Sequence, residues 1–176
     1  MKILGLDPGT ATTGYGLIET DGVNSKILCC GVIKTIPSKK HSQRLLEIHN
    51  DVSELIKKHK PDACAVEQLF FANNQKTAFS VGQARGILLL AIEKAGLPLH
   101  EFTPLQVKQA LVGYGKADKK QVQKMVQVVL GLNAIPKPDD AADALAIALT
   151  CAGTKRWGES VKFKKQNAKL QCKIKK

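Results

Sequence analysis

The chain has 176 residues, a hydrophobic fraction of 44% and a formal net charge of +12. This length and composition predict one globular domain, and the lack of any apolar run of ~18 residues excludes a membrane span. The N-terminal residues do not resemble a signal peptide, and the five cysteines fit reduced thiols better than disulfides, so we expect a cytoplasmic protein.

The predicted elements alternate in a way that is typical of an α/β fold. In chain order they are strands at 2–7, 15–19 and 25–34, a helix at 42–60, a strand at 63–67, a helix at 77–95, a strand at 99–102, and helices from 104, at 119–130 and at 139–150. Asp21-Gly22 marks a hairpin turn between the second and third strands. Hairpin-linked strands followed by strand–helix alternation predict a five-stranded mixed sheet flanked by helices.

Four acidic residues stand in settings that normally exclude a lone carboxylate. Asp7 and Glu67 end apolar strands, and Asp140 and Asp143 lie in an alanine-rich run. A charge there costs several kcal/mol unless a cation compensates it, and none of the four has a lysine or arginine beside it in the sequence. Because Mg²⁺ selects hard oxygen ligands, the pattern predicts a metal-dependent enzyme, and the charge of +12 indicates a nucleic-acid substrate.

The spacing of these acids allows one shared site. Strand-end carboxylates face the crevice at the end of an open α/β sheet, and positions three apart share one face of a helix. Two divalent ions held there could hydrolyse a phosphodiester. Two points stay open from spacing alone: Asp139 is also compatible with Asp143 on a helix, and either Asp139 or Asp140 could serve as a helix N-cap.

Basic residues gather in the second half of the chain. Five lysines form one cluster: Lys108, Lys116, Lys119, Lys120 and Lys124. The helix at 119–130 is expected to bury the opposite, apolar side, which carries Val122, Met125, Val126 and Val129. The lysines would bind phosphates or form an ordinary solvated face. Residues 151–176 hold nine basic residues and one acid, a charge of +8, and predict a flexible basic tail that contacts DNA or only adds solubility.

Several motifs resemble the RuvC family of bacterial Holliday-junction resolvases, in order and at the family's spacing, from residue 2 to about residue 150. The matching segments are Gly5-Leu6-Asp7-Pro8-Gly9-Thr10, Thr13-Gly14-Tyr15-Gly16, Ala65-Val66-Glu67-Gln68-Leu69-Phe70, Gly82-Gln83-Ala84-Arg85-Gly86, Gln106-Val107-Lys108-Gln109, Lys119-Lys120-Gln121-Val122-Gln123 and Asp140-Ala141-Ala142-Asp143-Ala144-Leu145-Ala146.

The resemblance implies an RNase H-like nuclease domain over 1–150, a tail over 151–176, and a homodimer. It implies an endonuclease that requires Mg²⁺, two ions per site with Mn²⁺ as a substitute, and resolves four-way junctions by symmetric nicks, leaving 5′-phosphate and 3′-hydroxyl ends. A RuvA–RuvB branch-migration complex would be a partner. The implied metal ligands are Asp7, Glu67, Asp140 and Asp143. The implied DNA contacts are Phe70, which would stack on junction bases, and Lys108 and Lys119.

Arg85 lies between two glycines, Gly82 and Gly86, and is expected to reach a phosphate near the site. The run at 87–92 is apolar nearly all round, which favours a dimer interface on its exposed side. Parts of the sequence also suggest two other functions. The first motif also resembles the phosphate loop of actin-like ATPases, but the chain is too short for their two domains. An RNA-processing or non-catalytic relative, such as the YqgF group, is the alternative within the superfamily.

Overall fold

The computed structural model describes residues 1–68 and 75–154. Ten elements follow one another along this part of the chain: β1 (Lys2–Asp7), β2 (Thr12–Thr20), β3 (Ser25–Lys34), α1 (His41–His59), β4 (Ala63–Glu67), α2 (Gln75–Lys94), β5 (Leu99–Phe102), α3 (Pro104–Val112), α4 (Lys119–Val129) and α5 (Asp139–Gly153). Their types and order agree with the predicted pattern.

The strands form one five-stranded sheet in the order β3-β2-β1-β4-β5. The first three strands are antiparallel neighbours, whereas β4 and β5 run parallel to β1. The mixed five-stranded sheet is therefore confirmed. β2 begins three residues earlier than predicted, at Thr12, because Thr12 and Thr13 pair with β3. α5 continues to Gly153, so the first three residues of the segment predicted as a tail, 151–153, are helical; residues 155–176 lie outside the described part of the chain.

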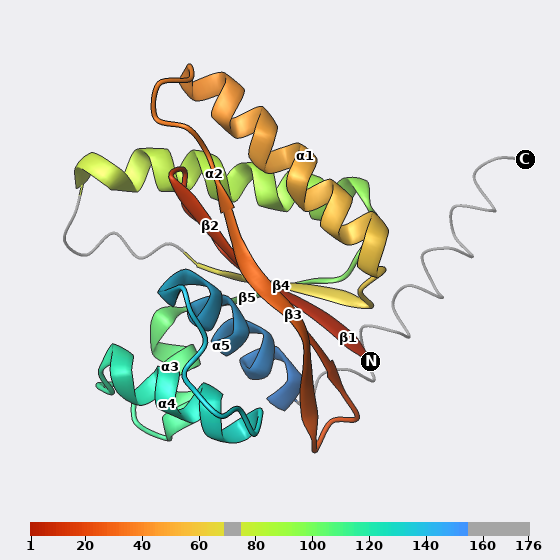
Figure 1. The fold of residues 1–176 in the computed structure, drawn as a ribbon, viewed down its shortest axis with the longest axis vertical. Helices are drawn as coiled ribbons and strands as arrows, with labels where there is room; N and C mark the ends of the chain where they lie inside the picture. The colour runs from red at the N-terminus through yellow and green to blue at the C-terminus, as the bar shows by residue number, and fades with distance from the viewer. Residues whose placement is uncertain (69–74, 155–176) are drawn as a thin grey trace, which may run out of the picture.

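Helices cover both faces of the sheet (Figure 1). α1 and α2 pack on one face, and α3, α4 and α5 lie on the other. Side chains alternate between the faces along a strand, so Leu4 and Leu6 of β1 join the apolar cluster under α1 and α2. Ile3 joins the second cluster, with Leu145 and Ile147 of α5. This alternation decides which face each strand-end carboxylate occupies.

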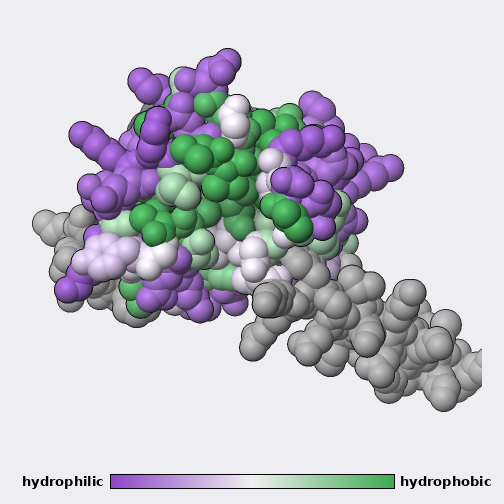
Figure 2. Space-filling view, turned by 90° about the horizontal axis from the view of Figure 1, so that it is seen from below, coloured by the Kyte–Doolittle hydropathy of each residue, from purple (hydrophilic) through white to green (hydrophobic). Residues whose placement is uncertain are grey.

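The side of the molecule that carries α3, α4 and α5 exposes part of its apolar surface. Figure 2 looks at the molecule from below and shows an apolar area bordered by hydrophilic side chains.

Val122 and Val126 of α4 are buried as expected, but the prediction for Val129 is wrong, because its side chain is 44% exposed. Val129 is the last residue of α4, and the next residue, Leu130, packs against the core cluster in its place. None of the helices within 1–68 and 75–154 is both long and apolar enough to span a membrane.

Candidate active site

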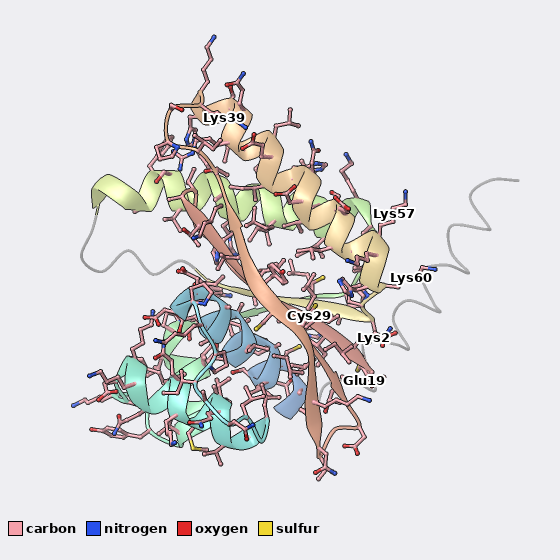
Figure 3. All side chains as sticks on the ribbon, in the orientation of Figure 1. Lys2, Glu19, Cys29, Lys39, Lys57 and Lys60 are labelled. Carbon is pink, nitrogen blue, oxygen red and sulfur yellow. The ribbon has the colours of Figure 1, made fainter. Side chains whose placement is uncertain are left out.

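Asp7 and Glu67 end two adjacent parallel strands. Leu6 of β1 is paired with Val66 of β4, so the two acidic residues that follow stand side by side at the same edge of the sheet. Both continue the alternation of Ile3 and Ala65, whose side chains face α3, α4 and α5. Lys2 and Glu19, labelled in Figure 3, mark the opposite end of these strands. The sequence prediction that the two strand ends meet is confirmed.

Three glycines allow α5 to lie directly on the sheet. A Cβ atom at Gly5 would collide with the backbone of Ala144, one at Gly14 with the backbone of Asp140, and one at Gly16 with Leu145. Gly14 is also the partner of Asp7 across β1 and β2. The missing side chains thus bring the first turns of α5 against the end of β1, which carries Asp7.

The start of α5 separates the three neighbouring aspartates. Pro138 is the N-cap, without a side-chain capping bond, and Asp139 and Asp140 lie in the first helical turn. The alternative that either aspartate caps the helix is therefore wrong. The Asp139 side chain is 64% exposed, whereas Asp143 is 30% exposed and lines a cavity with Asp7 and Glu67. Asp140 lies beside Gly14, above the end of β1.

The cavity has a volume of about 210 Å³ and lies between the sheet end and α3, α4 and α5. Its walls are apolar, apart from three carboxylates and two lysines. The residues around it are Asp7, Glu67, Pro104, Val107, Lys108, Lys119, Val122, Asp143, Ala146 and Ile147. Carboxylates thus converge in a pocket where water is partly excluded, and where each negative charge strongly affects its neighbours.

The pKa values of these acids are raised by their surroundings. Burial, and then repulsion by Glu67, Asp143 and Asp140, raise the pKa of Asp7 to about 8. Burial and repulsion by Asp143 raise the pKa of Glu67 to about 7. The pKa of Asp143 is also raised, mainly by burial, although Lys119 opposes the shift. The site holds more negative charge than its own cations balance.

Lys119 lies beside the acidic residues of the cavity. The sequence analysis predicted it as a DNA contact and not as a partner of these acids. Its Nζ donates to a carboxylate oxygen of Asp143 at 2.8 Å and lies 3.5 Å from Asp139. The Asp118 side chain caps α4 by accepting from the Gln121 N–H at 2.9 Å, which fixes the helix start that carries Lys119. This cation partly neutralises the acids in the metal-free protein.

The donor set fits hard divalent cations. Carboxylate oxygens are the ligands that Mg²⁺, Mn²⁺ and Ca²⁺ prefer, and the raised pKa values of Asp7 and Glu67 indicate a charge that a bound cation would compensate. Within the described residues, no three acidic, histidine or cysteine side chains stand close enough to hold one ion between them. Asp143 is paired with Lys119 in this arrangement, so its carboxylate already has a cationic partner.

The predicted DNA-binding residues differ in where they lie. Lys108 and Lys119 line the cavity. The other lysines of the cluster are exposed outside it: Lys116, Lys120 and Lys124, of which Lys124 donates to Gln127 at 2.8 Å. Phe70 lies outside the described residues. Arg85 does not line the cavity; it is engaged by Glu101 and by the backbone of Glu67.

Two residues to which the sequence analysis gave no individual role hold the strand ends in place. Thr10, just after β1, donates from its hydroxyl to the Ser80 carbonyl of α2 at 2.7 Å, and its own carbonyl accepts from the Thr35 hydroxyl at 2.6 Å. Glu101 of β5 pairs with Arg85. The signal in the sequence for Glu101 was weak: a charged residue inside a four-residue strand.

Comparison with known proteins identifies the family. The family model "Crossover junction endodeoxyribonuclease RuvC" matches residues 3–151, which is most of the chain. The chain belongs to this family. A RuvC from Heliobacterium modesticaldum is 53% identical over 158 residues, covering 90% of this chain and 98% of that one. The expectation of RuvC membership is confirmed, and the family assignment favours a junction nuclease over an RNA-processing relative.

Solved RuvC structures share the fold. The Thermus thermophilus RuvC structure has a TM-score of 0.82 at 42% identity and covers 90% of this chain and 97% of its own. A second T. thermophilus RuvC structure, in complex with a Holliday junction substrate, has a TM-score of 0.81 at 39% identity, with the same coverage. The RNase H-like fold is thereby confirmed. Nucleases of the RuvC family depend on divalent metal ions, in agreement with the acidic cavity.

The raised pKa values predict how pH affects the metal-free protein. Because the folded state holds the Asp7 proton more tightly than the unfolded chain, the contribution of Asp7 to stability is fully present below the unfolded pKa of 3.8 and is lost as pH rises to about 8. Denaturation in chelator should show a loss of roughly 2–5 kcal/mol across this window. Asp7→Asn should remove most of the slope; an unchanged slope in the variant would contradict this assignment.

Proposed function

We propose that this protein is a Mg²⁺-dependent endonuclease that resolves four-way DNA junctions by symmetric nicks in opposing strands, leaving 5′-phosphate and 3′-hydroxyl ends. The observation that carries the proposal is the acidic cavity, in which Asp7, Glu67 and Asp143 meet at the end of the sheet. Its support is membership in a family with a T. thermophilus relative in complex with a Holliday junction substrate.

Four carboxylates form the proposed metal site: Asp7, Glu67, Asp140 and Asp143. Asp7 would be the central ligand of this set, since its charge interacts with each of the other three. Bound divalent ions would supply an activated water and neutralise charge on the leaving oxygen. Mn²⁺ should substitute for Mg²⁺, because it takes the same oxygen ligands.

Basic residues around the cavity would hold the phosphate backbone. Lys108 and Lys119 line the cavity and would contact the phosphate next to the scissile bond, once Asp143 binds a metal ion in place of Lys119. Lys116, Lys120 and Lys124 would extend this contact along the backbone on an exposed surface. Phe70, three residues after Glu67, is proposed to stack on an unpaired base at the junction.

A cleavage assay tests the proposed substrate. A mobile four-way junction and a linear duplex of the same sequence should be compared at equal salt with Mg²⁺ and with Mn²⁺. We expect paired nicks in opposing arms of the junction, with ends that DNA ligase seals, and cutting of the duplex at least ~100-fold slower, because the duplex does not supply the branch contacts. Equal cutting of the two substrates would exclude junction selectivity.

Symmetric nicking of two strands requires two active sites, and we propose that α2 forms the interface of a homodimer. α2 exposes Phe79 at 74% and Leu90 at 50%, and these positions are three helical turns apart on one stripe. Gly86 lies on the same stripe, and a Cβ there would meet nothing within the chain. An exposed apolar stripe of this kind is typical of a protein–protein interface.

Leu90→Glu should convert the dimer into a monomer, since a carboxylate would be buried in the interface without a partner. Light scattering during size-exclusion chromatography measures the mass directly, and paired nicking of a junction should turn into single nicks. Val128→Glu on α4 is the matched control, because Val128, at 59% exposure, is at least as exposed as Leu90 but lies on another helix. A dimer that persists in Leu90→Glu would place the interface elsewhere.

Family membership also supports two broader proposals. A branch-migration complex of the RuvA–RuvB kind would deliver the junction to this nuclease. The cytoplasm would be its location, in agreement with four free cysteines among the described residues: Cys29, Cys30, Cys64 and Cys151.

A further inference from the structure

Among the residues that the structure describes, Arg85 of α2 makes two polar contacts, both at the metal-site end of the sheet. Its Nη2 pairs with a carboxylate oxygen of Glu101 on β5, and its Nε donates to the backbone carbonyl of Glu67 at 3.1 Å. The side chains of Arg85 and Glu101 are only 20% and 33% exposed. The guanidinium thus bridges two neighbouring strands at the residue that carries a proposed metal ligand.

The bridge lies on the face of the sheet opposite the metal site. The Glu67 side chain points toward the cavity beside α5, whereas Val66 belongs to the apolar cluster with Leu88 of α2. Glu101 is paired with Val66 in register and faces the same way as Val66, toward α2. Arg85 therefore reaches the main chain of Glu67 from behind, while the carboxylate extends into the cavity in front.

We infer that Arg85 is a positioning residue, which fixes the end of β4 so that the Glu67 carboxylate meets the metal site, and that Glu101 holds Arg85 in place. This rests on the proposed role of Glu67 as a metal ligand. Arg85 thereby has a function other than the phosphate contact that its place between two glycines predicts. A residue that supports a metal ligand is as important for metal affinity as many ligands are.

The geometry explains why arginine is needed here. Glu67 is the last residue of β4 and follows the final residue pair between β4 and β1. Its backbone carbonyl therefore lies beyond the regular hydrogen bonds between these two strands. A half-buried carbonyl requires a donor. The planar guanidinium offers donors in two directions at once, one to the carbonyl and one to the carboxylate, and a lysine ammonium has no such fork.

Two variants separate positioning from phosphate binding: Arg85→Gln and Glu101→Gln. Binding of Mn²⁺ alone to the full chain, measured by calorimetry, reports the metal site without DNA. Binding of a four-way junction in chelator, measured by fluorescence anisotropy over a salt series, reports the phosphate contacts. Lys94→Gln is the matched control, since Lys94 is an exposed cation near the far end of the same helix.

We expect Arg85→Gln to weaken Mn²⁺ binding by about 10- to 100-fold and to leave junction affinity in chelator within about twofold of the parent. Glu101→Gln should weaken Mn²⁺ binding in the same direction, and the double variant should lose less than the sum of the two, since the residues act as one unit. Arg85→Lys should restore only part of the affinity, because it can keep one of the two contacts.

The opposite pattern would overturn the inference. If Arg85 bound phosphate, Arg85→Gln would lower the salt dependence of junction binding by about one phosphate contact, and Glu101→Gln would release the guanidinium and strengthen binding. An Mn²⁺ affinity that is unchanged in Arg85→Gln would also overturn the positioning role of Arg85. Glu67→Gln is measured alongside: if it too leaves Mn²⁺ binding unchanged, the metal assignment fails and not only the role of Arg85.

Discussion

Asp7→Asn should abolish metal-dependent cleavage of a four-way junction, with a rate lower by a factor on the order of 10³ or more. Asn keeps the shape of the side chain and one oxygen, but it removes the charge that the other three carboxylates surround. Asp7 interacts with Glu67, Asp140 and Asp143, so its charge contributes to each ion that the site would hold. Among the Asp→Asn and Glu→Gln changes at the proposed ligands, we expect this one to weaken metal binding most.

The same substitution should stabilise the metal-free protein. The pKa of Asp7 is raised to about 8, mainly by burial. Near pH 8 the folded state is therefore destabilised by an ionised carboxylate that few cations compensate. An amide has no such cost. Single-turnover cleavage and denaturation in chelator should therefore change in opposite directions, which excludes unfolding as the reason for lost activity.

Asp139→Asn is the matched control for this experiment. Asp139 is a neighbouring aspartate at the start of α5, but its side chain is 64% exposed and does not line the cavity. We expect cleavage within about threefold of the parent, as for most exposed substitutions. Cleavage that survives in Asp7→Asn, or that disappears in Asp139→Asn, would contradict the choice of ligands.

The parts of this site that sequence could predict are those that depend on local pattern. Asp7 and Glu67 each end a short apolar strand, and parallel strands place their C-terminal ends at one edge of a sheet. The spacing of Asp140 and Asp143 gives them a common helix face. Choosing Asp140 over Asp139, however, required the resemblance to a family, because both spacings suit a helix.

The side-chain partners could not be predicted in the same way. Lys119 and Asp143 come from different helices, and their contact at 2.8 Å depends on how α4 packs against α5. Arg85 and Glu101 likewise come from a helix and a strand whose packing no local pattern specifies. A glycine-flanked arginine suggested a phosphate contact, and only the three-dimensional arrangement shows that its charge is already paired.

Gly14→Ala should have the second largest effect. Gly14 is paired with Asp7 across β1 and β2, and a Cβ there would lie deep inside the van der Waals contact of the Asp140 carbonyl. Because the obstacle is backbone and not a flexible side chain, α5 must move away from the sheet. We expect a loss of stability of roughly 2–4 kcal/mol, at the upper end of overpacking effects.

Cleavage by Gly14→Ala should fall by about 10²-fold even at a temperature where the variant is fully folded, because a shift of ~1 Å in α5 separates Asp140 and Asp143 from Asp7. Affinity for the junction in chelator should change little, since Lys108 lies on α3 and not on α5. Gly153→Ala, in the last turn of α5, is the control: a Cβ there meets no atom of the described residues within 4 Å, and we expect the parent's rate. A folded Gly14→Ala variant with unchanged cleavage would show that the close contact between α5 and the sheet does not set the distance between the carboxylates.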